Sequence, residues 1–346
     1  MTYTRELASF TAMLTYDRLA PHAREMAKRC MLDWLGIAIR GSLETPSRIL
    51  RRVLGPSGRS EATVFAAGLP KDTVYQAALW NGAASHSLDF DDLHNPSIIH
   101  PACVVIPGVF AIAEKEHAPG TDMIAAVCAG YEASGRVGES VNPESYYFWH
   151  TTGTAGTFGA AAAAANLLHL DTDRTIQCYG SAGTQAAGLW EFLKDGAMSK
   201  PLHAGKSAFA GVLAAYLAQD GFTAASQILE GEKGFCRAMS ATPHLEKLTE
   251  GLSRGRLKID DNSFKPYACC KHSHATLYAL QTLRDEQDLK PEQIERIEVR
   301  VNEITNYLIN NGNPKTPYGC KFSLQYCCAA MLVNGVVGIE EFTDRA

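Results

Sequence analysis

The sequence lacks the segments that would place a protein in or across a membrane. Its first residues, Met1 to Leu7, do not show the basic and then apolar order of a signal peptide. The most apolar window, Leu32 to Ile39, falls short of the roughly 18 residues that span a bilayer. With a formal net charge of −5, the chain has no overall positive field to hold nucleic acid or an anionic lipid surface. We therefore expect a cytoplasmic protein that binds neither nucleic acid nor membranes.

Motifs for several kinds of cofactor and catalyst are missing as well. None of the ten cysteines forms a C-x-x-C pair, so zinc ribbons, iron–sulfur clusters and thioredoxin chemistry have no support. No G-x-S-x-G elbow occurs, so a serine hydrolase has no support either. The cysteines are spread through a long chain, a pattern that favours reduced thiols over a disulfide scaffold. We expect no metal and no cofactor.

The sequence is rich in apolar residues at helical spacing. Its 346 residues, of which 46% are hydrophobic, suffice for about two domains with large cores. Alanine and glycine dominate several stretches, most of all Ala160 to Ala165, and such faces let neighbouring helices approach closely. The spacing predicts helices over residues 21–40, 73–88, 122–139, 153–168 and 207–217.

The pattern changes after Gly251. Residues 294–301 alternate Ile and Val with Glu and Arg, which is typical of a strand with one buried face. We also predict a short strand over 257–260 and helices over 274–284 and 322–333. Alternating strands and helices favour a smaller α/β, or α+β, domain over residues 251–346. The predicted fold class is mainly α, with a large all-helical domain over residues 1–250.

The densest group of polar residues runs from Ser85 to His94 and closes on His100-Pro101. The carboxylates of Asp89, Asp91 and Asp92 are hard oxygen ligands, but their spacing does not match an EF-hand. The alternative is a helix end at which aspartates cap and turn the chain. Because the group follows a buried-looking helix and leads into an apolar run, we favour a functional site here.

A run of glycines and hydroxyl side chains, residues 150–159, precedes the alanine-rich helix. It is not G-x-G-x-x-G, and neither a strand before it nor a Walker lysine after it supports nucleotide binding. Close packing of helices explains the glycines without any ligand. His150 and the N–H groups of a helix start can still bind a carboxylate.

Two further segments gather positive charge in an acidic chain. Residues 196–206 carry two lysines and a histidine among small and apolar residues, and the alternative is a solvated loop. Residues 264–274 hold two lysines and two histidines, which make a local positive site. Cys270 is a candidate nucleophile there, although buried cysteines more often serve as small hydrophobic residues.

Taken in order, these motifs resemble those of the MmgE/PrpD family, which includes 2-methylcitrate dehydratase, cis-aconitate decarboxylase and an iminodisuccinate epimerase. The ordered set covers nearly the whole chain. The matching segments are Ser-Leu-Asp-Phe-Asp-Asp (87–92) with His100-Pro101, residues 150–159, Lys-Pro-Leu-His-Ala-Gly (200–205), residues 264–274 and Phe-Ser-Leu-Gln-Tyr (322–326).

The resemblance implies a fold and an assembly. Members of the family pair a large helical domain with a smaller α/β domain, usually as a homodimer. Their active site lies in the cleft between the two domains. They also continue past the end of this chain with a segment that returns to the helical domain, so we expect the chain to be truncated there.

The resemblance also implies which residues form the site. The expected catalytic residues are His100, Asp89, Lys200 and Lys265. The expected substrate-binding residues are His150, His203, Lys271, His274 and Tyr307. In this chain Cys270 stands where the decarboxylase has a histidine, and Lys271 or His274 is the expected replacement.

The chemistry shared by the family is removal or delivery of a proton next to a carboxylate. That proton is weakly acidic, so the enolate-like anion needs positive charge, which Lys200, Lys265 and Lys271 supply if they converge. His100 is the expected general acid or base, with Asp89 orienting its ring.

The predicted function is a cofactor-independent lyase for a di- or tricarboxylate, in first place a hydro-lyase resembling 2-methylcitrate dehydratase. An epimerase of an amino- or imino-dicarboxylate needs the same residues, and a decarboxylase of cis-aconitate is a further alternative. An inactive binding or structural protein stays open because of the expected truncation.

Overall fold

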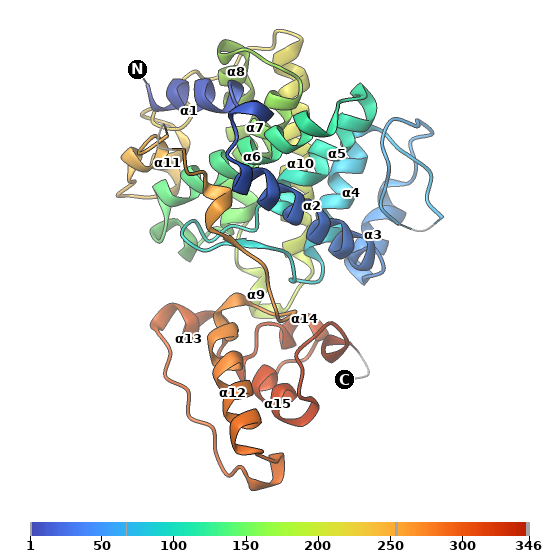
Figure 1. Ribbon diagram of the computed structural model, residues 1–346, viewed down its shortest axis with the longest axis vertical. Helices are drawn as coiled ribbons and strands as arrows, with labels where there is room; N and C mark the ends of the chain where they lie inside the picture. Colours follow the sequence, from blue (N-terminus) through green and yellow to red (C-terminus); the bar gives the residue numbers. More distant parts are fainter. Residues whose placement is uncertain (1, 67, 253–254, 344–346) are drawn as a thin grey trace. The chain divides into compact units, whose positions relative to one another are not determined.

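The chain divides into two compact units. The computed structural model describes residues 2–66, 68–252 and 255–343. Unit 1 consists of Met1–Ser87, Asp91–Trp190 and Ser199–Phe264, and unit 2 of Leu88–Phe90, Glu191–Met198 and Lys265–Ala346. Helices dominate both units (Figure 1), so the predicted mainly α fold class is confirmed.

Unit 1 is a layered bundle of α-helices connected by loops and short 3-10 turns. Its α-helices are α1 (Tyr3–Ala12), α2 (Pro21–Gly41), α3 (Thr45–Leu54), α4 (Val74–His86), α5 (Ala102–Glu116), α6 (Gly120–Val141), α7 (Thr151–Leu167), α8 (Thr172–Gly183), α10 (Ser199–Gln219) and α11 (Phe235–Met239). Its 3-10 turns are η1 (Tyr16–Arg18), η2 (Glu144–Tyr147), η3 (Leu245–Leu248) and η4 (Lys258–Asp261).

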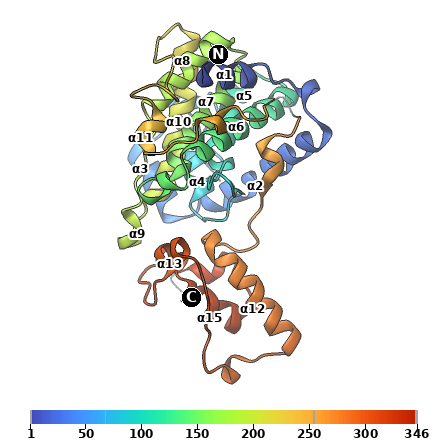
Figure 2. The same ribbon diagram turned by 90° about the vertical axis from the view of Figure 1, so that its left-hand side faces the viewer.

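Helix α7 forms the centre of unit 1, and all 17 of its residues are buried. It packs against α5, α6, α8 and α10 (Figure 2). The approach is so close that a Cβ atom on Gly159 would lie 2.6 Å from the Cβ of Ser134 on α6. A Cβ atom on Gly211 of α10 would lie 2.5 Å from the carbonyl carbon of Ala160. The alanine- and glycine-rich sequence is therefore what permits this packing.

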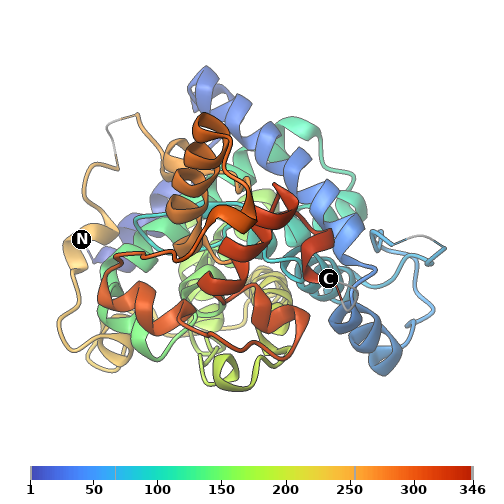
Figure 3. The ribbon, with the colours of Figure 1, turned by 90° about the horizontal axis from the view of Figure 1, so that it is seen from below.

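Unit 2 is built from shorter helices. They are α9 (Phe192–Asp195), α12 (His274–Gln287), α13 (Glu303–Ile309), α14 (Pro317–Cys320) and α15 (Leu324–Asn334), with the 3-10 turns η5 (Lys271–Ser273), η6 (Pro291–Gln293) and η7 (Glu340–Phe342). Its core lies where α12 packs against α15, drawn in orange and red in Figure 3. Leu277 of α12 is buried there with Cys327 and Met331 of α15.

Each helix predicted from apolar spacing is present, with shifts at the ends. The largest shift concerns α10, which begins at Ser199 rather than at residue 207. Pro201 lies in its first turn, where a missing N–H costs no intrahelical hydrogen bond. The positive segment 196–206 is therefore mostly helical rather than a solvated loop.

The strand predicted over residues 257–260 is wrong, because these residues enter the 3-10 turn η4. The N–H of Leu257 donates to the Asp260 carboxylate at 3.0 Å, and the N–H of Lys258 donates to Glu132 at 2.7 Å. Since carboxylates occupy these donors, they are not available for a strand ladder.

The alternating segment 294–301 is also not assigned as a strand, and no partner strand lies beside it among the described residues. The paired strands in the described part of the chain are β1 (Leu93–His94) and β2 (Asn262–Ser263), which run antiparallel in unit 1.

No helix within residues 2–66, 68–252 and 255–343 combines the length and apolar character needed to cross a bilayer.

The contact between α7 and α10 gives a stability prediction. Gly211→Ala places a methyl group against the backbone of Ala160 and Ala161, so we expect it to lower the free energy of unfolding by about 1–3 kcal/mol. Gly36→Ala, on the exposed side of α2 with no atom near the added Cβ, should instead raise it by about 0.5–1 kcal/mol. Urea denaturation measures both, and equal effects at the two sites would contradict the packing described here.

Candidate active site

Asp92 anchors the polar loop between α4 and α5 in unit 1. Its carboxylate is fully buried and accepts hydrogen bonds from the Tyr131 hydroxyl at 2.6 Å, the Asn262 amide at 2.7 Å and the N–H of Ala102 at 3.0 Å. Burial raises the pKa of Asp92 to about 6, while the Tyr131 hydrogen bond acts in the opposite direction. Asp92 therefore joins α5, α6 and β2, and the capping role weighed for this motif is real at this position.

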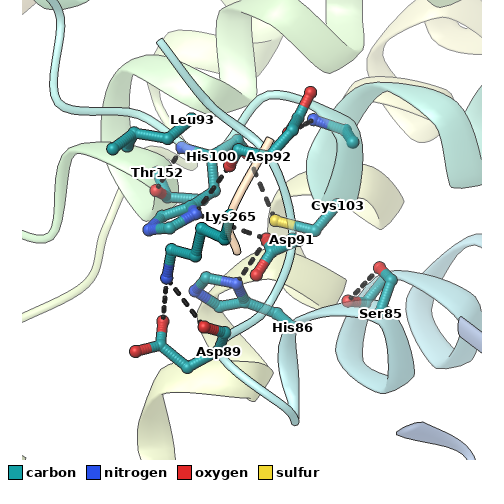
Figure 4. A network of polar contacts seen from close by, with 12 residues as sticks. Ser85, His86, Asp89, Asp91, Asp92, Leu93, His100, Cys103, Thr152 and Lys265 are labelled. Carbon is teal, nitrogen blue, oxygen red and sulfur yellow. Dashed lines mark hydrogen bonds and ion pairs between the residues drawn. The ribbon is translucent and has the colours of Figure 1, made fainter. Parts of the chain in front are cut away.

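His100 precedes α5, and both its ring and its backbone N–H form hydrogen bonds. Its Nδ1 lies 2.8 Å from the carbonyl oxygen of Asp92, and its N–H donates to Thr152 Oγ1 at 3.1 Å. The Asp91 carboxylate lies 3.6 Å from the same Nδ1 (Figure 4). Because a carbonyl oxygen can only accept, Nδ1 carries a proton, and Nε2 is the ring nitrogen that can exchange a proton with another group. Within unit 1, Asp92 and Asp91 thus contribute to the orientation that the resemblance assigned to Asp89.

His86, at the end of α4, forms a buried ion-pair-type contact with Asp91. Its Nδ1 lies 2.7 Å from Asp91 Oδ2, and both side chains are completely buried (Figure 4). The ring is stacked on His150 at 5.4 Å between centroids and meets His100 edge-on at 4.9 Å. His86 is thus a central member of the cluster, although the sequence motif did not single it out. The five-residue spacing of His86 and Asp91 across the end of a helix is the signal that could have revealed it.

His150 and His203 extend the cluster from the starts of α7 and α10. Their Nδ1 atoms lie 3.2 Å apart, and the ring of Trp190 lies 4.7 Å from that of His150. Burial and the charge of Lys200 hold the pKa of His150 well below its usual value. Burial, followed by the charge of Lys206, lowers the pKa of His203 to about 4. Both imidazoles are therefore neutral near pH 7.

The two lysines of α10 differ in their surroundings. Lys206 donates to the carbonyl oxygens of Gly153, Gln185 and Ala187 at 3.0 to 3.2 Å, and burial lowers its pKa to about 8. Such a lysine fastens α10 to the start of α7. Lys200 is 3% exposed, and its charge acts on His150, so it belongs to the histidine cluster.

Unit 2 holds the other expected site residues. Lys265 Nζ donates to the carbonyl oxygen of Asp89 at 2.7 Å and to its carboxylate at 3.2 Å (Figure 4). It also donates to the Cys269 carbonyl at 3.2 Å. Asp89 has a φ of 51°, in the left-handed region that aspartate adopts more readily than most residues other than glycine. His274 Nε2 lies 3.2 Å from the same Cys269 carbonyl. The ion pair between Lys265 and Asp89 is buried, and the Cys269 carbonyl joins it to His274.

Lys271 and Tyr307 lie at the margin of this group. Burial, followed by the charge of Lys265, lowers the pKa of Lys271, so the two lysines are close enough to repel each other. Tyr307 lies on α13 and is 60% exposed. The structure thus gathers His100, His150, Lys200 and His203 in unit 1 and Asp89, Lys265, Lys271 and His274 in unit 2.

One group of side chains in unit 1 has the composition of a metal site. Donor atoms of His86, Asp91 and Cys103 lie within 4.8 Å of one another, and all three residues are buried. However, the 2.7 Å between His86 Nδ1 and Asp91 Oδ2 is a hydrogen-bond distance, shorter than the roughly 3.3 Å between two ligands of one zinc ion. Burial also raises the pKa of Cys103 far above its usual range, which keeps it a thiol. His86 Nδ1 and Asp91 bind each other, and the Cys103 thiol donates to the His100 carbonyl at 3.2 Å, so these residues do not fit a resident metal.

Buried neutral imidazoles beside buried lysines, on a helical scaffold, define a protein that can transfer protons and hold an anion. The chain belongs to the MmgE/PrpD family. Residues 5–248 match the MmgE/PrpD N-terminal domain and residues 267–346 match the MmgE/PrpD C-terminal domain. The family resemblance of the sequence motifs is thereby confirmed.

Curated relatives are similar over almost the whole chain. The cis-aconitate decarboxylase-like protein oryM of Aspergillus oryzae is 27% identical over 99% of this chain and 76% of its own length. The human cis-aconitate decarboxylase is 28% identical over 99% of this chain and 72% of its own. That of Aspergillus terreus is 26% identical over 99% and 74%. These relatives support an enzyme of the lyase type.

A buried histidine next to the site gives a pH prediction. Burial, followed by the charge of Lys258, lowers the pKa of His94 to about 4, while its Nδ1 is bonded to Ser97 Oγ at 2.7 Å. Between about pH 6.5 and 4 the unfolded chain therefore binds a proton that folded His94 does not, and stability falls as pH falls. We expect His94→Gln to flatten this loss between pH 7 and pH 4.

Urea denaturation across that pH range measures the effect. His244→Gln is the control, because the His244 side chain is 58% exposed, and it should keep the slope of the wild type. An unchanged slope in His94→Gln would show that folded His94 titrates like an exposed histidine.

Proposed function

We propose that this chain is a lyase that acts on a tricarboxylate by moving a proton next to a carboxylate, with decarboxylation of cis-aconitate as its reaction. The observation that carries the proposal is the arrangement of His100, whose Nδ1 is bonded to the Asp92 carbonyl so that Nε2 is the proton-transfer atom. The names of the relatives support the choice of substrate.

The proposed chemistry needs a proton and a cation. When the bond between carbon and a carboxylate breaks, CO2 leaves and the electron pair stays on a carbon conjugated with the remaining carboxylates. His100 delivers the proton that this carbon takes up, and Lys200 and Lys265 stabilise the negative charge that forms. Because buried charges interact strongly, each of these groups counts for more here than in water.

The neutral histidines supply substrate contacts in this proposal. Nε2 of His86 and Nε2 of His150 are buried and have no hydrogen-bond partner among the described residues. An unpaired buried polar atom costs free energy, which a bound carboxylate or its bridging water recovers. His86 and His150 are therefore proposed to bind the substrate together with His203, Lys271, His274 and Tyr307.

Turnover assays test the reaction. We expect the purified chain to release one CO2 for each cis-aconitate consumed, measured by gas release and by proton NMR of the remaining acid. Dehydration of 2-methylcitrate also needs proton transfer, for which His100 is again the candidate. An unsaturated product from that acid without CO2 would therefore favour the hydro-lyase instead. Solvent deuterium entering an unconsumed amino- or imino-dicarboxylate would favour an epimerase. No turnover of any of these acids at high enzyme concentration would contradict the proposal.

Replacing His100 tests its role in proton transfer. His100→Gln removes the group that titrates, so we expect kcat to fall by about 10²–10⁴ with a smaller change in KM. His244→Gln, at a largely exposed position, should keep the wild-type rate. Circular dichroism checks that both variants are folded, and a wild-type kcat in His100→Gln would remove His100 from the mechanism.

Lys265 is tested together with its buried partner. Lys265→Ala alone leaves the Asp89 carboxylate buried without this cation, which destabilises unit 2. The double variant Lys265→Ala, Asp89→Asn removes both charges, so we expect it to fold better while kcat/KM falls by about 10² or more. Near-wild-type kcat/KM in the folded double variant would assign the pair a structural role only.

Two further parts of the proposal rest on the family resemblance. The chain is proposed to form a homodimer and to work in the cytoplasm without a cofactor. The division into a helical domain over residues 1–250 and a smaller domain over residues 251–346 is likewise proposed as the functional division of the protein.

A further inference from the structure

A small pocket lies at the surface of unit 1, where α3 packs on α4. Its volume is about 200 Å³. Most of its lining is apolar and includes the side chains of Leu43, Phe65, Leu69 and Trp80. Arg48 and Arg51 of α3 contribute the positive charge of the lining. An apolar pocket with a few charged groups is typical of a small-molecule site, and none of its described lining residues belongs to the histidine cluster.

The two arginines carry charge that no carboxylate balances. They lie one turn apart on α3, a helix that contains neither an acidic residue nor a buried one. The guanidinium of Arg51 lies over the ring of Trp80, 5.0 Å from its centre. Glu44, next to the start of α3, pairs with Arg40 at 2.6 Å. Neither Arg48 nor Arg51 forms an ion pair with any of the described residues, so the pocket favours an anion.

Two buried donors in the lining have no acceptor among the described residues. They are Nε1 of Trp80, whose side chain belongs to a residue only 5% exposed, and Nη1 of Arg51. Both groups can donate a hydrogen bond but cannot accept one. A buried donor without an acceptor costs free energy, which an oxygen atom of a bound anion recovers. Arginine also matches a carboxylate in shape, because its two parallel N–H groups bind both oxygens.

The part of the lining formed by Phe65 is held in place by polar and aromatic contacts. The Asn81 side chain accepts a hydrogen bond from the N–H of Phe65 and donates one to the carbonyl oxygen of Thr63, both at 2.9 Å. The Phe65 ring meets the rings of Trp34 and Phe110 edge-on, at 5.4 and 5.6 Å between centroids. This wall is therefore fixed before a ligand binds, which lowers the cost of ordering it.

We propose that this pocket is a binding site for a carboxylate that carries a flat apolar group, such as an arylalkanoic acid. The carboxylate accepts hydrogen bonds from Arg48 and Arg51, and the apolar group lies against Phe65, Leu69 and Trp80. The tricarboxylate of the proposed function has no such apolar group. The ligand of this pocket is therefore a second molecule, and its binding does not depend on the reaction proposed above.

NMR of the full chain tests the site with phenylacetate as the probe. The four tryptophans give separate indole N–H signals after ¹⁵N labelling, and the signal missing in Trp80→Phe is that of Trp80. We expect phenylacetate to shift this signal saturably, with a Kd of about 1 mM or lower. Acetate lacks the apolar group and benzyl alcohol lacks the charge, so each should bind at least about tenfold more weakly. No saturable shift at Trp80, or an equal affinity for acetate, would overturn the proposal.

Substitutions on α3 assign the charge that binds the probe. Arg51→Gln should raise the Kd of phenylacetate about tenfold or more, as measured by calorimetry, because it removes the charged donor. Arg52→Gln is the matched control, since Arg52 is the next residue of the same helix, is exposed and does not line the pocket. Arg48→Gln, at an exposed position, should weaken binding in the same direction and gives a second test if Arg51→Gln fails to fold by circular dichroism. A wild-type Kd in both pocket variants, or an equal loss in Arg52→Gln, would overturn the assignment.

Discussion

The buried carboxylate of Asp92 is the interaction on which the geometry of unit 1 depends. It binds the first N–H of α5, the Tyr131 hydroxyl of α6 and the Asn262 amide of β2, while its own carbonyl fixes Nδ1 of His100. A buried carboxylate is stable only when its lone pairs are satisfied, so each donor must stay in place. Asp92, which joins α5, α6 and β2, thus also determines which nitrogen of His100 exchanges protons.

The second constraint is the complete burial of α7. Close approach of α6 and α10 requires glycine at Gly159 and Gly211, where an added Cβ would lie 2.5 to 2.6 Å from atoms of the neighbouring helix. Because α7 and α10 are packed so tightly, the Nδ1 atoms of His150 and His203, near the starts of these helices, are held 3.2 Å apart. Rigid helices rather than loops therefore set the spacing of the histidine cluster, as a preorganised site requires.

Charge is distributed differently in the two units. In unit 1, burial and neighbouring lysines keep His150 and His203 neutral, so the imidazoles act as hydrogen-bonding groups near pH 7. In unit 2, Lys265 pairs with Asp89, and the Cys269 carbonyl joins Lys265 to His274. The cationic side chain of unit 2 is thus held by an ion pair and a carbonyl oxygen, whereas the imidazoles of unit 1 are uncharged.

The sequence by itself determined the helices and the family, because apolar spacing and ordered motifs are local properties of the chain. It also indicated Lys265 and His100, through segments dense in charge. Tertiary structure alone decided that His86 joins the cluster, that Asp92 orients His100, and that residues 257–260 turn instead of forming a strand. These features depend on which distant groups share a buried space, since burial and neighbouring charge, rather than residue type, set hydrogen-bond partners and pKa values.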